Sequence, residues 1–159
     1  MINTRPPAVA GAFYPGHPAT LAATVDQLLA EASAPAASQP KALIVPHAGY
    51  IYSGSTAALA YAALEPWRRT IHRVVLLGPT HRVAVNGLAL PETEAFSTPL
   101  GTVRLDLQAI AALADLPQIV FSDRVHADEH SLEVHLPFLQ RVLDDFRLVP
   151  LAVGHAAPE

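Results

Sequence analysis

The sequence of 159 residues contains no cysteine. Disulfide bonds and thiolate metal ligands are therefore excluded within this chain, so any metal site must use nitrogen and oxygen ligands. Positive charge is scarce and scattered as well, since ten Lys and Arg residues leave a net charge of −4 and only Arg68 and Arg69 adjoin. Nucleic-acid surfaces need clustered positive charge, so we expect no nucleic acid partner.

Long apolar runs and targeting signals are also missing. No apolar stretch approaches the roughly 18 residues that a membrane-spanning helix needs, and residues 1–16 lack the positive-then-apolar pattern of a signal peptide. We therefore expect a cytoplasmic protein that does not associate with membranes. What the sequence does contain is apolar: 51% of its residues are hydrophobic, which predicts one globular domain with its own core.

Short apolar runs alternate with segments of helical character. Strands are predicted at 42–45, 73–77, 119–121 and 148–153, with short irregular strands and turns within 87–105. Helices are predicted at about 18–33, 55–64, 106–114 with Asp106 as its cap, and 132–143. A Pro-rich connector at 34–40 follows the first helix. The helix at 55–64 lies between two apolar strands, which indicates a βαβ unit with buried parallel strands and hence the α/β class.

Two histidines follow two of these predicted strands. His47 comes directly after 42–45 in PHAGYIYSG, and His81 comes shortly after 73–77 in GPTHR. The carboxyl ends of parallel strands open on one edge of a sheet, so the two imidazoles are expected to converge there on a metal ion. The alternative is that each histidine caps its loop by hydrogen bonding.

A dense polar segment, HADEHSLEVH, occupies residues 126–135. His130 is expected at a loop-to-helix junction beside Asp128 and Glu129, where an imidazole can exchange protons near neutral pH, so we assign it as a catalytic proton donor or acceptor. We assign Asp128 to the same pocket. The alternatives are a structural role for His130 and a helix-capping role for Asp128 or Ser131.

Aromatic residues occupy the same loops. Phe13 lies in GAFYPG and Tyr52 in HAGYIYSG, where glycines allow close backbone approach. Both side chains can wall a pocket beside His47, and simple core packing is the alternative.

Five motifs together resemble the Memo family, the Memo component (protein B) of the AmmeMemoRadiSam system. In order along the chain they are GAFYP, PHAGYIYSG, LLGPTHR, DEHSLEVHLPFLQ and LVPLAVG. A chance match to all five in the same order is implausible, so the chain is identified as a member of this family.

The resemblance implies a three-layer α/β/α domain related to class III extradiol dioxygenases, with a mixed, largely parallel central sheet. It implies that His47 and His81 bind iron, as Fe(II), or copper, that His130 is the pocket histidine, and that Tyr52 and Phe13 line the pocket. In related dioxygenases two histidines and one carboxylate hold Fe(II) and leave positions open for oxygen and a catecholate.

Memo proteins continue beyond LVPLAVG, and that continuation carries the third metal ligand. We therefore expect residues 1–159 to form a single Memo-like domain that is incomplete at its C-terminus and holds its metal weakly. The expected function is a metal-dependent redox or dioxygenase-like role, and the alternative is a non-catalytic module that binds protein or peptide through a vestigial pocket. Expected partners are a small aromatic ligand, a protein or peptide, or a radical SAM protein.

Overall fold

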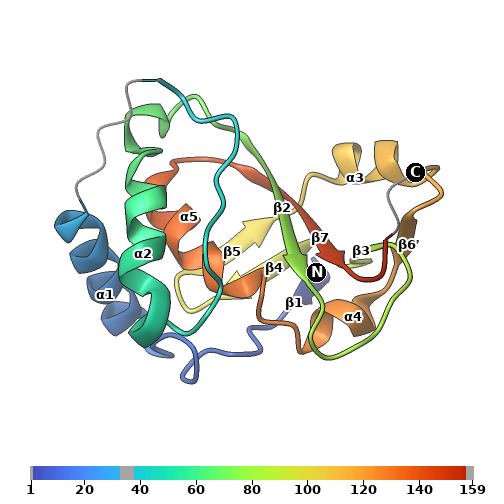
Figure 1. Cartoon of the computed structure of the whole chain (residues 1–159), viewed down its shortest axis with the longest axis horizontal. Coiled ribbons are helices and arrows are strands. Elements are labelled where there is room, and N and C mark those ends of the chain that lie inside the picture. The colour runs from blue at the N-terminus through green and yellow to red at the C-terminus, as the bar shows by residue number, and fades with distance from the viewer. Residues whose placement is uncertain (1, 33–37, 157–159) are drawn as a thin grey trace.

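A computed structural model describes residues 2–32 and 38–156 of the chain, so most of the predicted connector lies outside the described residues (Figure 1). Helices gather at one end of the molecule: α1 (Pro18–Glu31), α2 (Tyr50–Ala62) and α5 (Leu136–Val142). The short helices α3 (Leu107–Leu113) and α4 (Asp123–Ala127) flank the strands, and 3₁₀ turns occur at η1 (Glu65–Trp67) and η2 (Glu133–His135). The combination of helices and sheets confirms the α/β class.

The strands form two sheets, ordered β1-β4-β5 and β2-β7-β3-β6. Parallel pairing joins β2 to β7, β3 to β6 and β1 to β4, whereas β3 runs antiparallel to β7 and β4 to β5. Both sheets are therefore mixed. The strands are β1 (Thr4–Arg5), β2 (Arg73–Pro79), β3 (Leu88–Leu90), β4 (Ala95–Thr98), β5 (Gly101–Arg104), β6 (Ile119–Phe121) and β7 (Arg147–Val153).

Several elements lie where the sequence predicts them. Strands β2, β6 and β7 cover the predicted runs at 73–77, 119–121 and 148–153, and three short strands fall within 87–105. The Asp106 carboxylate accepts a hydrogen bond from the Ala109 backbone N–H at 2.9 Å, which confirms the predicted cap of α3.

Three predictions about the sheet are wrong. Residues 42–45 form no strand, so α2 is not the crossover of a βαβ unit. The reason is that β2 ends its sheet and no described segment pairs with its outer edge. In place of one central sheet there are two, because Leu105, which follows β5, and Leu148 of β7 are joined by an isolated bridge and not by a ladder. Finally, β2 is not buried on both faces: Val75 and Leu77 remain 54% and 56% exposed.

The helical end of the molecule holds much of the core. Leu21 and Val25 on α1 are fully buried. A Cβ at position 54 would lie 3.0 Å from the Leu28 side chain, so Gly54 lets α2 approach α1 closely. Helix α2 begins at Tyr50, earlier than composition predicts, because the buried Tyr50 hydroxyl donates to the Val134 carbonyl at 2.8 Å and fixes this turn. None of the described helices is long and apolar enough to cross a bilayer.

Candidate metal centre

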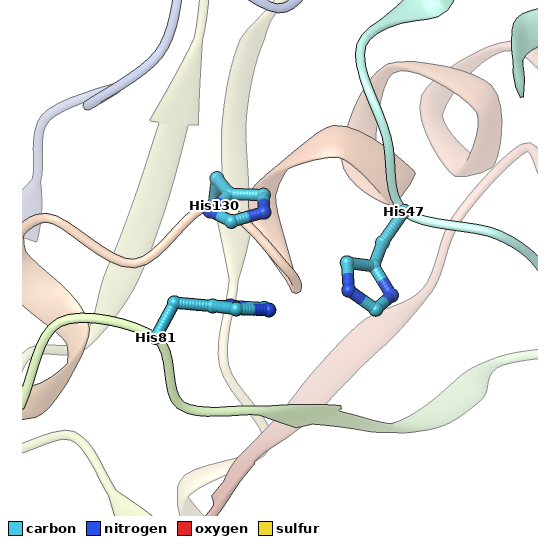
Figure 2. Close-up of side chains that lie close together, drawn as sticks. All are labelled: His47, His81 and His130. Atoms are coloured by element: carbon cyan, nitrogen blue, oxygen red, sulfur yellow. The ribbon is translucent and has the colours of Figure 1, made fainter. Parts of the chain in front are cut away.

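Three histidines from distant parts of the sequence converge at one end of β2 (Figure 2). One ring nitrogen each from His47, His81 and His130 lie within 4.8 Å of one another. The rings of His81 and His130 are stacked, with centroids 4.4 Å apart and planes inclined by 29°. The ring of His47 lies 5.3 Å from that of His81 and 5.8 Å from that of His130.

The loop before α2, rather than the end of a strand, positions His47. The Tyr50 backbone N–H donates to the Phe13 carbonyl at 2.8 Å, which fastens this loop to the turn at residues 11–14. The Phe13 ring in turn contacts the His130 ring, with centroids 4.6 Å apart. His47 therefore reaches the cluster through contacts with the N-terminal segment, which sequence spacing does not reveal.

The end of β2 positions His81. The Ser131 hydroxyl donates to the Pro79 carbonyl at 2.8 Å, which ties this end to the segment that carries His130. A Cβ at position 78 would lie 2.7 Å from the Ser131 hydroxyl oxygen, so only glycine fits there. The two histidine-bearing loops are thus in direct contact.

The buried Glu129 carboxylate lies between these two loops. Its Oε1 accepts hydrogen bonds from the backbone N–H groups of His130 and Ser131, both at 2.9 Å, and lies 2.9 Å from His81 Nδ1. Its Oε2 accepts from the His81 backbone N–H at 2.5 Å. Burial by itself raises the pKa of Glu129, but the hydrogen bonds from His81 and Ser131 outweigh it and hold that pKa at about 2.

The environment favours neutral imidazoles. Burial lowers the pKa of His47, and repulsion from His81 lowers it further. Burial also lowers the pKa of His130, although the Glu129 carboxylate acts in the opposite direction. Both rings are therefore neutral at pH 7, the form in which imidazole binds a metal.

The cluster dimensions fit a metal ion. Zinc–nitrogen bonds of ~2.1 Å in a tetrahedral site hold nitrogens roughly 3.4 Å apart. The observed separations, within 4.8 Å, need the rings to close by about 1.5 Å at most to reach this geometry. Imidazole suits iron, copper and zinc, and three such groups can hold an ion, although they do not select one among these metals.

An open apolar hollow of about 550 Å³ adjoins the cluster. Both predicted aromatic residues line it, together with His47 and His130. Phe13 is half-buried against His130, whereas Tyr52 projects from the start of α2 and is 81% exposed. The remaining lining residues are Ala12, Pro46, Ala48, Gly49 and Ile51.

The structure places Asp128 apart from this hollow. Its side chain is exposed and borders a smaller depression of about 240 Å³ with Ala8, Val9 and Arg82. Glu129 adjoins His130 in the sequence, whereas the closest imidazole to its carboxylate is that of His81. The position of Glu129 beside His130 in the sequence DEH indicates a carboxylate near the histidine cluster. Nothing in the sequence indicates that its hydrogen-bond partner is His81.

The hydrogen-bond network beneath the cluster could not be predicted from the sequence. The fully buried Glu133 carboxylate pairs with Arg5 at 2.7 Å. Arg5 in turn donates to the backbone carbonyls of His126 and Glu129, at 2.6 and 2.8 Å. These contacts connect positions more than 120 residues apart in the sequence, so no local pattern signals them.

Comparison with known proteins identifies the family. A family model described as Memo-like protein matches residues 5–159. The chain is 39% identical over 153 residues to a MEMO1 family protein of Aquifex aeolicus, an alignment that covers 96% of this chain and 55% of the relative. It is 40% identical over 156 residues to a MEMO1 family protein of Archaeoglobus fulgidus, covering 94% and 54%.

A vertebrate relative matches at similar strength. The chain is 36% identical over 150 residues to Protein MEMO1 of Danio rerio, covering 91% of this chain and 50% of the relative. The chain spans about half the length of the curated relatives it matches. With the family model matching nearly its whole length, the chain belongs to the Memo family.

Proposed function

We propose that this protein binds an iron or copper ion at the three-histidine cluster and uses it in a redox or dioxygenase-like role. The observation that carries this proposal is the convergence of three imidazole nitrogens within 4.8 Å beside an open apolar hollow. Burial lowers the pKa of the His47 imidazole, which makes it available as a neutral ligand at pH 7. When bound, such an ion supplies redox chemistry and positions for oxygen and a small molecule.

Ring orientation supports different roles for the three histidines. The lone pair of an imidazole nitrogen lies in the plane of its ring, so the stacked rings of His81 and His130 direct their lone pairs side by side. His47 and His81 are tilted by 53°, and the free edge of His81 faces His47 (Figure 2). We assign His47 and His81 as ligands and His130 as the residue that takes or gives a proton above them.

The hollow is suited to a small aromatic ligand. Its lining is mainly apolar, and Phe13 and Tyr52 offer ring faces or edges for stacking. A ligand held there would lie against both His47 and His130, because both line the same hollow. The residues that bind the ligand, exclude water and exchange a proton would then all lie on the surface of this one hollow.

A metal titration tests the proposal. Calorimetry with Fe(II) under anaerobic conditions, and with copper, is expected to show one weak site per chain in the wild-type protein. His47→Ala should abolish it, whereas His72→Ala, which removes an exposed histidine outside the cluster, should not. Absence of binding by the wild type, or binding that survives His47→Ala, would overturn the proposal.

The role of His130 is tested separately from metal binding. His130→Ala should leave metal content largely intact and reduce turnover of an aromatic substrate by about 10²- to 10⁴-fold, the range for a lost general acid or base. Loss of metal in this variant would make His130 a ligand instead.

We further propose that additional polypeptide completes the domain in the whole protein, as the resemblance implies. Ile44 is fully exposed, Val75 and Leu77 are more than half exposed, and the outer edge of β2 is unpaired among the described residues. Exposed apolar edges promote aggregation and are normally covered. Hydrogen exchange at β2 should be slower in a chain extended by the family's continuation, and unchanged exchange would contradict this.

A non-catalytic binding module is the second candidate, and one observation favours it. Ile51 and Tyr52, at the rim of the hollow, are 87% and 81% exposed, a common property of peptide-binding surfaces. If metal fails to bind while apolar peptides bind with micromolar affinity and Tyr52→Ala weakens them, this candidate replaces the first.

A further inference from the structure

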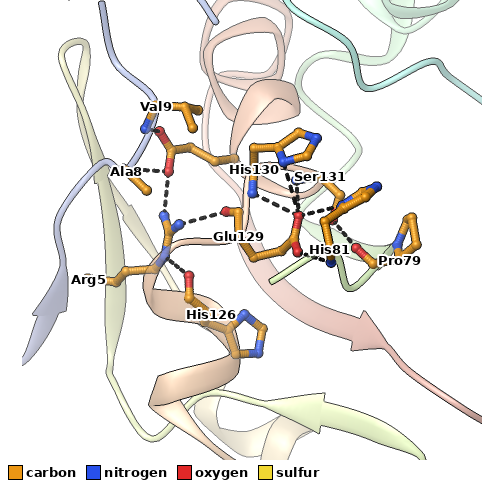
Figure 3. Close-up of polar contacts among 10 residues, drawn as sticks. Arg5, Ala8, Val9, Pro79, His81, His126, Glu129, His130 and Ser131 are labelled. Atoms are coloured by element: carbon orange, nitrogen blue, oxygen red, sulfur yellow. Dashed lines mark hydrogen bonds and ion pairs between the residues drawn. The ribbon is translucent and has the colours of Figure 1, made fainter. Parts of the chain in front are cut away.

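We propose that Glu129 is a positioning residue that fixes the tautomer and direction of His81, so that His81 offers only Nε2 to a ligand ion. This inference rests on the proposed metal function and assigns a role to a residue outside the cluster itself. Figure 3 shows the carboxylate between the two histidine-bearing loops.

The backbone partners of the Glu129 carboxylate are all hydrogen-bond donors. Oε1 of Glu129 accepts from the backbone N–H groups of His130 and Ser131, and Oε2 accepts from the backbone N–H of His81. A backbone N–H can only donate, so both carboxylate oxygens act as acceptors. None of these contacts requires a proton on either carboxylate oxygen. The Glu129 carboxylate therefore faces His81 Nδ1 as a hydrogen-bond acceptor.

The tautomer of His81 follows from this. Nδ1 lies 2.9 Å from Oε1, a hydrogen-bond distance, so Nδ1 must carry the proton that it donates to the carboxylate. In a neutral ring the remaining nitrogen, Nε2, then has the free lone pair. A hydrogen bond from the second nitrogen to a carboxylate is the usual means by which proteins orient a metal-binding histidine and raise its basicity.

The carboxylate is itself held in place. Glu129 is 2% exposed, and the Arg5 guanidinium donates to its backbone carbonyl at 2.8 Å. The Ser131 hydroxyl fastens the same segment to Pro79, two residues before His81. Glu129 therefore has little freedom to turn away. The His81 ring that it contacts is restricted in the same way (Figure 3).

His130 provides an internal comparison. Its Nδ1 lies 3.4 Å from Oε1, without a hydrogen bond, while its backbone N–H does bond to that oxygen. Glu129 thus fixes the backbone of His130 but leaves its ring free, and it fixes both backbone and ring at His81. The predicted effect on tautomer is confined to His81.

The experiment begins with the metal-free wild-type protein. Long-range proton–nitrogen NMR correlations report which ring nitrogen of His81 carries the proton. We expect Nδ1–H for His81, with Glu129→Gln shifting this population, because an amide places an N–H₂ group against one of the N–H donors around it. Glu94→Gln makes the same charge change at an exposed carboxylate and should leave His81 unchanged.

Metal affinity gives the second readout. Glu129→Gln should weaken Co(II) or Zn(II) binding by about 10- to 100-fold, as is usual when such a partner is lost, while Glu94→Gln binds as the wild type does. An Nε2–H tautomer of His81 in the wild type would overturn this inference whether or not any variant folds. A wild type that binds no metal but has Nδ1–H at His81 would instead overturn the proposed function, so the two failures are distinguishable.

Discussion

Two buried glutamates, four residues apart, have different roles in this fold. The Glu133 carboxylate receives Arg5, the Tyr14 hydroxyl and the backbone N–H groups of Ala8 and Val9. All four partners belong to the N-terminal segment, and none is a member of the three-histidine cluster. Glu133 therefore attaches the first residues of the chain to the body of the protein.

Glu129 has equally complete hydrogen bonding with a different result. Its partners belong to the loops that carry His81 and His130, and one of them is an imidazole at the open site. Burial and bonding of a carboxylate therefore do not distinguish a structural role from a functional one. The distinction lies in whether the bonded partner has another polar atom that faces the site.

The largest expected effect comes from removing the ion-pair partner of Glu133, the glutamate with the structural role. Arg5→Ala leaves the fully buried Glu133 without its counter-ion, and loss of one partner of a buried pair costs about 3–5 kcal/mol. Urea denaturation should show this decrease in the free energy of unfolding. Arg141→Ala, which removes an ion pair whose partners are 41% and 48% exposed, should cost under ~1 kcal/mol. Equal losses would contradict the contrast.

Acid should weaken the fold through a buried histidine. His126 is almost fully buried, and burial lowers its pKa to about 4, whereas an unfolded histidine titrates near ~6.5. Its stabilising effect is complete above pH 6.5 and is lost as pH falls toward 4, because only the unfolded chain takes up the proton. The total is roughly 3 kcal/mol.

His126→Gln sharpens this acid test. The glutamine amide can replace the contact of His126 Nε2 with the Ala89 carbonyl, and it does not titrate. Unfolding free energies at pH 7 and pH 4.5 should differ less in this variant than in the wild type. An unchanged pH dependence would assign the acid sensitivity elsewhere, for example to His135, whose pKa burial also lowers to about 4.

A smaller effect is expected when one uncharged hydrogen-bond donor to Glu133 is removed. Tyr14→Phe removes the hydroxyl that donates to the carboxylate, and a hydrogen bond to a charged group contributes about 1.5–3 kcal/mol. Tyr52→Phe removes an exposed hydroxyl and should change thermal stability by less than about 0.5 kcal/mol. A wild-type-like Tyr14→Phe would mean that the Glu133 network tolerates a missing donor.

The smallest effect concerns the partly buried carboxylate of Asp106, whose ion-pair partner Arg73 is exposed. Asp106 caps α3 and also accepts from Arg73, so Asp106→Ala should cost about 1 kcal/mol. Asp106→Asn, which keeps a capping oxygen, should recover most of this loss in thermal denaturation. If both variants lose as much as Arg5→Ala, burial is not what separates these carboxylates.

Much of the fold was predictable because apolar periodicity is local. The strands at 73–77 and 148–153 and the cap at Asp106 follow from neighbouring residues, and the structure confirms them. The strand at 42–45 was not correctly predicted, because an apolar run becomes a strand only where another strand pairs with it. Its composition contains no information about that partner.

The candidate site shows the same division. His47, His81 and His130 were identifiable from their motifs, and they converge, but His47 does so through the loop before α2 and not from a strand end. The sequence by itself determined the family, the class and which histidines are candidates for the site, because motifs and periodicity are properties of neighbouring residues. Only the tertiary structure decided that Glu129 faces His81 and Glu133 faces Arg5, because those contacts depend on how distant segments pack.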